Sequence, residues 1–160
     1  MRQFRNPRGF TLIELIVVVA IVSTLMAVAL DRLLYYEERA EQAMMNADLE
    51  AVKMGLRIRT AELMASGHGE RIPALENENP MRWMERPPAG YAGDYVAPPR
   101  HGSWYFAANT HELIYVPKNS AYLQGGAGPD RELHFRPALE MDGTSIAGVT
   151  IVPVTRFEWF

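Results

Sequence analysis

The sequence predicts an α+β fold in which one long N-terminal helix packs on a small antiparallel sheet. Three observations support this. Residues 10–54 contain no proline or glycine and are rich in residues that favour helix. Residues 103–160 hold short segments rich in β-branched and aromatic residues, separated by turn residues. Residues 66–102 are rich in proline and glycine but also contain aromatic residues, which predicts a packed connecting loop.

Residues 12–30 form a nineteen-residue apolar segment with a single charged residue, Glu14. As a helix with a rise of ~1.5 Å per residue it would be about 28 Å long, close to the thickness of a hydrocarbon core. The nine residues before Phe10 carry three arginines and no acid, so the positive-inside rule keeps the N-terminus in the cytoplasm. The sequence therefore predicts a single membrane span.

Glu14 is unusual because a carboxylate near the start of an apolar span is costly unless a cation pairs with it. A cut between Gly9 and Phe10 would create such a cation. The new α-amino group at Phe10 would lie one helical turn, about 6 Å, from Glu14. This pair could form within one chain or between neighbouring chains.

The stretch RGFTLIEL at residues 8–15 resembles the class III signal of type IV pilins and type II secretion pseudopilins. It combines a basic leader that ends in glycine, an uninterrupted apolar helix, and a glutamate at the fifth position after that glycine. The resemblance implies cleavage between Gly9 and Phe10 by a membrane prepilin peptidase and N-methylation of Phe10. It also implies assembly into a filament in which Glu14 recognises the N-terminus of a neighbour.

Two simpler interpretations of the apolar segment remain open. Ala27-Val28-Ala29 is an A-x-A pattern, which would fit an ordinary secretory signal cleaved after Ala29. A single-pass anchor that never polymerises would have the same hydropathy. Neither interpretation accounts for Glu14, since a glutamate weakens the partition of the segment into the bilayer.

Composition limits the partners and sites. The formal net charge is −3, and loss of the leader's three arginines would make it −6, so we expect no nucleic-acid binding. The absence of cysteine excludes disulfides and thiolate metal sites. It also departs from type IVa pilins, whose C-terminal loop is closed by a disulfide. We expect no cofactor.

We expect the helix to continue to about Ala65, with residues 10–30 in the membrane and residues 31–65 amphipathic. Two apolar stripes occur on the outer part at helical spacing. The bulkier stripe, which we expect to pack under the sheet, consists of Met45, Leu49, Val52, Leu56 and Leu63. The second stripe, which we expect to pack against other subunits, consists of Ala40, Ala43, Met44, Ala47, Ala51, Met54, Ile58 and Ala61. Alternatively, both stripes are buried within one subunit, or the alanines merely favour helix. Gly55 inside this helix costs about 1 kcal/mol relative to alanine, and the sequence offers no reason for it.

Residues 103–160 are expected to form an antiparallel sheet of three to five strands. Residues 103–108 and 112–117 flank a short turn and predict a hairpin in which Leu113 and Tyr115 oppose Trp104 and Phe106. Residues 131–136 alternate between apolar and polar side chains, which predicts a half-exposed strand. A last strand is expected over residues 149–154.

No arrangement typical of catalysis occurs in the sequence. Four histidines, His68, His101, His111 and His134, stand alone and are expected to be solvated. Asp130 and Asp142 lie in C-terminal loops, where major pseudopilins bind calcium, but the acidic glycine-rich loop of those proteins is not visible here. We therefore expect neither an enzyme nor a metal site.

Together these features predict a structural subunit of a type IV pilus-like filament in the inner membrane, with its C-terminal domain in the periplasm or, in a filament, outside the cell. The resemblance favours a type II secretion pseudopilin that supports protein export, and a minor type IV pilin of a surface pilus is the alternative. A membrane-anchored periplasmic binding module is the alternative of another class. The expected partners are other pilin-like subunits, alike or different, the prepilin peptidase, an inner-membrane assembly platform and the lipid bilayer.

Overall fold

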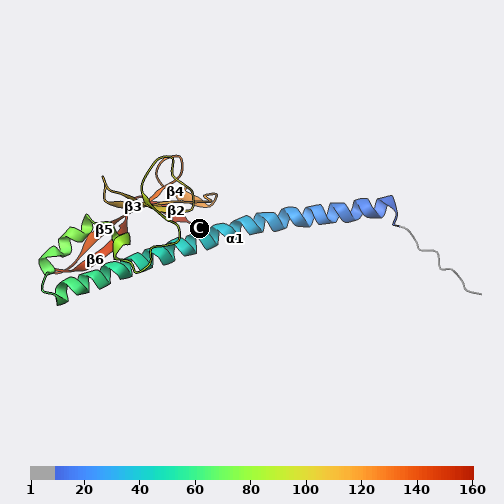
Figure 1. Ribbon diagram of the computed structural model, residues 1–160. Helices are drawn as coiled ribbons and strands as arrows, with labels where there is room; N and C mark the ends of the chain where they lie inside the picture. Colours follow the sequence, from blue (N-terminus) through green and yellow to red (C-terminus); the bar gives the residue numbers. More distant parts are fainter. Residues whose placement is uncertain (1–9) are drawn as a thin grey trace, which may run out of the picture. The chain divides into compact units, whose positions relative to one another are not determined.

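The computed structural model describes residues 10–160, so the expected leader, residues 1–9, and the cleavage residue Gly9 lie outside the described part. The chain divides into two compact units, Met1–Glu37 and Glu38–Phe160. One helix, α1 (Leu12–Ala65), contributes to both units (Figure 1). The predicted long N-terminal helix is therefore confirmed.

The described part of the first unit consists of residues 10 and 11 and the N-terminal part of α1. Thr11 precedes the helix, and its Oγ1 accepts a hydrogen bond of 3.3 Å from the backbone N–H of Glu14, as a helix N-cap does. Every residue from Leu12 to Leu34 is exposed. The most apolar stretch of α1 has a mean hydropathy of 2.7. By length and composition, α1 is able to cross a membrane.

The second unit contains a five-stranded sheet in the order β1-β2-β3-β5-β6. Its strands are β1 (Tyr91–Asp94), β2 (Ser103–Ala107), β3 (Glu112–Val116), β5 (Leu133–Asp142) and β6 (Ser145–Pro153). Strands β2, β3, β5 and β6 pair antiparallel, whereas β1 pairs parallel with β2. Strands β4 (Leu123–Gly125) and β7 (Phe157–Trp159) form a second, two-stranded sheet. The fold is α+β, as predicted.

The predictions for this region were incomplete in four places. Strand β5 runs from Leu133 to Asp142, whereas a strand over residues 131–136 was expected, because Pro137 argues against a continuing strand. The connecting loop contains two short 3-10 helices, η1 (Gly69–Glu76) and η2 (Pro80–Trp83), and the unpredicted strand β1. The last strand of the main sheet begins at Ser145 rather than near Val149. Strands β4 and β7 were missed because three-residue segments carry too little periodicity to be recognised.

The main core lies between α1 and one face of the sheet. All five residues of the bulky stripe are buried there, as predicted. Trp104 pairs with Tyr115 and Phe106 with Leu113, which confirms the predicted hairpin register. A smaller cluster, formed by Tyr105, Ala107, Ile114 and Val116, occupies the other face, where Tyr95 packs against it. Strands β2 and β3 are therefore buried on both faces.

Candidate assembly site

The second stripe of α1 is exposed along its whole length. The five alanines Ala40, Ala43, Ala47, Ala51 and Ala61 are all exposed, and so are the larger side chains Met44, Met54 and Ile58. Met54 and Ile58 are each 53% exposed. The alternative in which both stripes are buried within one subunit is therefore wrong. We call these eight residues the outer stripe.

Glu38 on the opposite face of α1 helps to fix the rotation of this helix. Its side chain is only 1% exposed. It accepts hydrogen bonds from Trp159 Nε1 at 2.9 Å and from the backbone N–H groups of Ala121 and Tyr122 at 3.1 and 2.9 Å. A buried carboxylate is tolerated only when it is paired or hydrogen-bonded in this way. Sequence reasoning missed this residue.

Two further carboxylates continue the same face. Glu41 accepts hydrogen bonds from Tyr115 Oη at 2.9 Å and from the backbone N–H groups of Lys118 and Asn119. Burial, together with the charge of Glu41, raises the pKa of Tyr115 well above its ordinary value. Asp48 accepts a hydrogen bond of 2.9 Å from Trp104 Nε1. Asp48 lies three positions after Met45, a member of the bulky stripe, and Glu41 and Glu38 lie four and seven positions before it. This helical spacing places the acids on the buried face and could have revealed them.

The C-terminus is also tied to α1. Trp159 is buried, and its carbonyl oxygen accepts a hydrogen bond of 2.6 Å from Gln42 Nε2. Phe160 stacks on Tyr122 with ring centroids 5.2 Å apart, and Arg39 Cζ lies 4.4 Å from the centroid of the Phe160 ring. The C-terminal residues Trp159 and Phe160 are therefore fastened to the turn of α1 that runs from Glu38 to Gln42.

Gly55, which no sequence pattern explained, permits a close backbone approach. A Cβ atom at this position would lie 3.0 Å from the carbonyl oxygen of Trp83, at the end of η2. The two segments form a groove of about 430 Å³. It is lined by Ala51, Met54, Gly55 and Ile58 of α1 and by Trp83, Met84, Glu85 and Arg86 of the loop.

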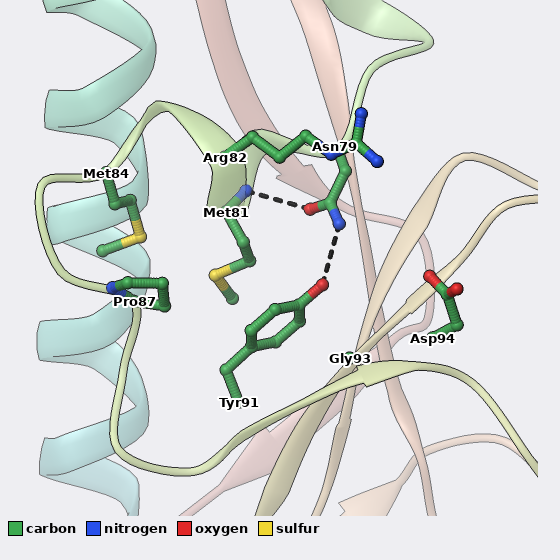
Figure 2. Close-up of a pocket in the computed structure, with 8 residues that line it drawn as sticks. All are labelled: Asn79, Met81, Arg82, Met84, Pro87, Tyr91, Gly93 and Asp94. Carbon is green, nitrogen blue, oxygen red and sulfur yellow. Dashed lines mark hydrogen bonds between the residues drawn. The ribbon is translucent and has the colours of Figure 1, made fainter.

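A second cavity of about 400 Å³ lies beside this groove, between η2 and β1 (Figure 2). The Asn79 side chain accepts a hydrogen bond of 3.0 Å from the backbone N–H of Met81 and donates one of 2.8 Å to Tyr91 Oη. The Asn79 amide thus caps η2 and ties it to β1. These contacts hold the connecting loop in place, which is a structural role.

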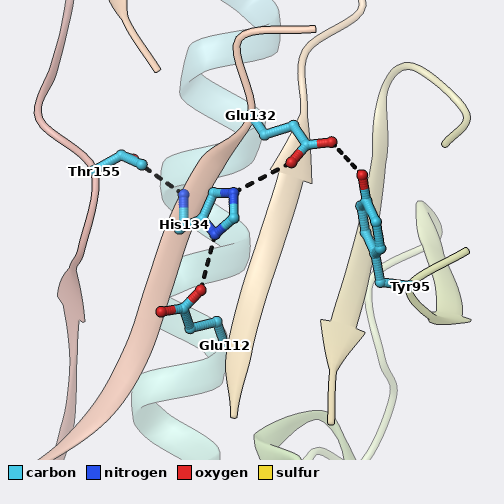
Figure 3. A network of polar contacts seen from close by, with 5 residues as sticks. All are labelled: Tyr95, Glu112, Glu132, His134 and Thr155. Carbon is cyan, nitrogen blue, oxygen red and sulfur yellow. Dashed lines mark hydrogen bonds and ion pairs between the residues drawn. The ribbon is translucent and has the colours of Figure 1, made fainter. Parts of the chain in front are cut away.

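The prediction that the histidines are solvated and stand alone was wrong for His134. Its Nδ1 lies 2.9 Å from Glu112 and its Nε2 lies 3.2 Å from Glu132 (Figure 3). Tyr95 Oη donates a hydrogen bond of 2.5 Å to Glu132. This bond, with burial and the charge of Glu132, raises the pKa of Tyr95 to about 12. The network joins the segment after β1 to the sheet.

Within residues 10–160, no group of three or more histidine, aspartate or glutamate side chains could hold a metal ion. His134 has its two carboxylates on opposite ring nitrogens, so they do not converge on one point. Asp130 lies 3.8 Å from His101 Nε2. No ion pair or hydrogen bond within the described residues involves the carboxylate of Asp142.

Phe10 and Glu14 lie at the start of α1. Phe10 is 74% exposed, and Glu14 occupies the first helical turn. No residue between 10 and 160 forms an ion pair or a hydrogen bond with the Glu14 carboxylate. The Glu14 side chain is therefore an exposed, unpaired carboxylate at the N-terminal end of α1, where the helix dipole favours negative charge.

Residues 4–30 match the family described as the prokaryotic N-terminal methylation motif. The chain carries the prepilin-type signal of type IV pilins and pseudopilins. No curated protein and no solved structure matches the chain. The motif supports a type IV pilin-like protein, and proteins of this kind are structural rather than catalytic. The apolar part of α1, near the N-terminus, fits a single-pass membrane anchor.

Proposed function

We propose that this pilin-like chain is a structural subunit of a type II secretion pseudopilus that supports protein export. The observation that carries the proposal is the methylation motif on a helix whose outer stripe is exposed and whose Glu14 carboxylate has no partner among residues 10–160. The other side of α1 is occupied by the sheet. One face of the helix therefore stabilises the subunit, while the other is accessible to neighbouring subunits.

Processing prepares the helix for assembly in this proposal. Prepilin peptidase cuts between Gly9 and Phe10, and the new amino group at Phe10 is methylated. This group is a cation, and within a bilayer its attraction to the Glu14 carboxylate of a neighbour is much stronger than in water. Ala40, Ala43, Ala47 and Ala51 then allow neighbouring helices to approach closely outside the membrane.

The test combines mass spectrometry with the substitution Glu14→Leu in the native host. The intact mass of the membrane-extracted wild type should correspond to a chain that begins at methylated Phe10. Glu14→Leu should be cleaved and inserted normally but should lose incorporation into filaments at least tenfold, since it removes only the partner of the new amine. Glu14→Asp, which keeps the charge, should retain part of the assembly.

A start at Leu30 or an uncut Met1 would contradict the proposed processing, and normal assembly of Glu14→Leu would show that the ion pair is dispensable. Deletion of the chain separates the two family alternatives. Loss of an exported protein with surface filaments unchanged supports the pseudopilin. Loss of surface filaments with export unchanged supports a minor pilin of a surface pilus instead.

A further inference from the structure

The exposed apolar surface of α1 continues past Leu30, where the sequence predicted the end of the membrane span. Leu33 and Leu34 are 54% and 52% exposed, and Tyr36 is 63% exposed. Burial begins at Glu38, the first residue of the second unit, which is only 1% exposed. Leu33, Leu34 and Tyr36 therefore present apolar surface that the described part of the chain leaves largely uncovered.

The residues after Leu30 are divided between two sides of the helix. At about 100° per residue, Leu33 and Leu34 lie within about 60° of Leu30, so they continue one apolar face for a further turn. Asp31 and Arg32 lie about 100° and 160° away from Leu30, on the other side of the helix. The apolar surface therefore reaches Leu34 on one side and stops before Asp31 on the other.

This surface is continuous with the apolar span, which favours lipid as its partner. Every residue from Leu12 to Leu34 is exposed, on all faces of the helix, and a helix that is apolar all round fits a bilayer. These 23 residues make a helix of about 35 Å. A tilt of about 30° would reduce its height to about 30 Å, which is the thickness of a hydrocarbon core.

The side chains at the end of this surface suit the headgroup region. Tyrosine is enriched at the membrane–water interface, because its ring is apolar and its hydroxyl is polar, and Tyr36 is exposed at this level. Arg32 is exposed, and an arginine near the end of a span extends its guanidinium to the interface, where phosphate groups accept its hydrogen bonds.

We propose that α1 contacts a phospholipid bilayer as far as Tyr36. Leu33 and Leu34 lie in the hydrocarbon, and Arg32 and Tyr36 lie among the phospholipid headgroups. The helix is tilted, so that the face with Leu33 and Leu34 lies deeper than Asp31. This inference rests on the membrane anchor in the proposed function and not on assembly into filaments.

Cysteine accessibility tests the proposed boundary, because the wild type has no cysteine. Single-cysteine variants of the full chain are reconstituted in vesicles of phosphatidylethanolamine and phosphatidylglycerol. Each reacts with a membrane-impermeant maleimide, and its rate constant is divided by that of the same variant in SDS. Leu33→Cys and Leu34→Cys should give a ratio at least roughly tenfold below that of the control Ala40→Cys, because the hydrocarbon excludes water.

Asp31→Cys is the matched variant for the tilt. It should react at least roughly threefold faster than Leu34→Cys, although Asp31 is nearer to the middle of the span. Equal protection of these two variants would overturn the tilted arrangement. Rates for Leu33→Cys and Leu34→Cys equal to that of Ala40→Cys would overturn the proposed boundary and leave the anchor standing. If Leu25→Cys also reacted as fast as Ala40→Cys, the anchor and the proposed function would both be contradicted.

Fluorescence quenching distinguishes lipid from a neighbouring helix as the cover of this face. Bimane attached to Leu34→Cys should be quenched by phospholipid that carries a nitroxide on its acyl chain, at least roughly twofold more than bimane attached to Ala40→Cys. Protection of Leu34→Cys without this quenching would show that a second copy covers the face. That result would overturn the bilayer contact.

Discussion

Asp48 affects the stability of the fold in two opposite ways: its hydrogen bond stabilises the folded state, whereas its buried charge destabilises it. Burial raises its pKa, and the hydrogen bond from Trp104 Nε1 opposes that shift. An acid with a raised pKa in the folded state stabilises the fold at pH values below its ordinary pKa of 3.8. This contribution is lost as the pH rises through the folded-state pKa. At neutral pH the charge of Asp48 therefore opposes folding.

We therefore expect Asp48→Asn to raise the free energy of unfolding slightly at pH 7, since the amide oxygen still accepts from Trp104. The matched variant Asp48→Ala should lower this free energy by about 1–3 kcal/mol, because it leaves a buried indole N–H without an acceptor. Urea denaturation of residues 38–160 measures both. Equal losses in the two variants would show that the charge, rather than the hydrogen bond, stabilises the fold.

Gly55 allows a second prediction at this scale. Gly55→Ala should have a small net effect, because a gain of about 1 kcal/mol in helix propensity is offset by the contact with the Trp83 carbonyl. Gly55→Leu cannot be accommodated and should lower the free energy of unfolding by about 2–3 kcal/mol. Ala47→Leu, on the exposed face, is the control and should change it by less than about 0.5 kcal/mol. Thermal melts that rank these variants differently would contradict the close approach.

Among the elements, the segment that follows β1 is linked to the sheet by a backbone hydrogen bond from Tyr95 to Phe106 and by the Tyr95 side chain. Tyr95 packs on the small cluster of β2 and β3, lies across Tyr105 with centroids 5.7 Å apart, and donates to Glu132. Because the hydrogen bond to Glu132 requires the protonated phenol, this attachment depends on pH in the alkaline range.

The pKa of Tyr95 rises from 10.0 to about 12 on folding, so its contribution to stability is complete below pH 10 and is lost between pH 10 and about 12. Tyr95→Phe should be less stable than wild type below pH 10, and the difference should shrink toward pH 12. Urea midpoints from pH 8 to 12 measure this. Other tyrosines titrate in both proteins, so a difference that stays constant with pH would contradict the role of the hydrogen bond.

At the scale of the whole molecule, the outer stripe should be dispensable for the subunit and essential for the filament. Residues 38–160 form a compact unit whose core includes the bulky stripe and the sheet. We expect this fragment to be a soluble, folded monomer. Ala47→Glu should leave its melting temperature within about 2 °C of wild type, because Ala47 is exposed. In the full chain the same change should abolish assembly, as electron microscopy of filaments would show.

If Ala47→Glu instead strongly lowered the melting temperature of the fragment, the outer stripe would have a role inside the subunit. The assignment of two faces to α1 would then be wrong. Ala47→Ser is the matched control in both assays. It should preserve folding and assembly, because serine remains small enough for neighbouring helices to approach.

The sequence by itself determined the features that depend on local periodicity. The uninterrupted run after Phe10 predicted α1, its apolar content predicted the span, and the spacing of Met45, Leu49 and Val52 predicted the buried face. The signal around Gly9 and Glu14 was recognisable for the same reason, since all of its residues lie within one short stretch.

Only the tertiary structure decided which polar groups meet. Asp48 and Trp104 are 56 residues apart, and Glu38 and Trp159 are 121 apart, so no local pattern relates the partners. The same holds for Gly55, whose missing side chain matters only because Trp83 folds back onto the helix. Contacts of this kind arise because the sheet buries one face of α1. Acids on that buried face then require hydrogen-bond partners, while apolar residues on the opposite face remain exposed.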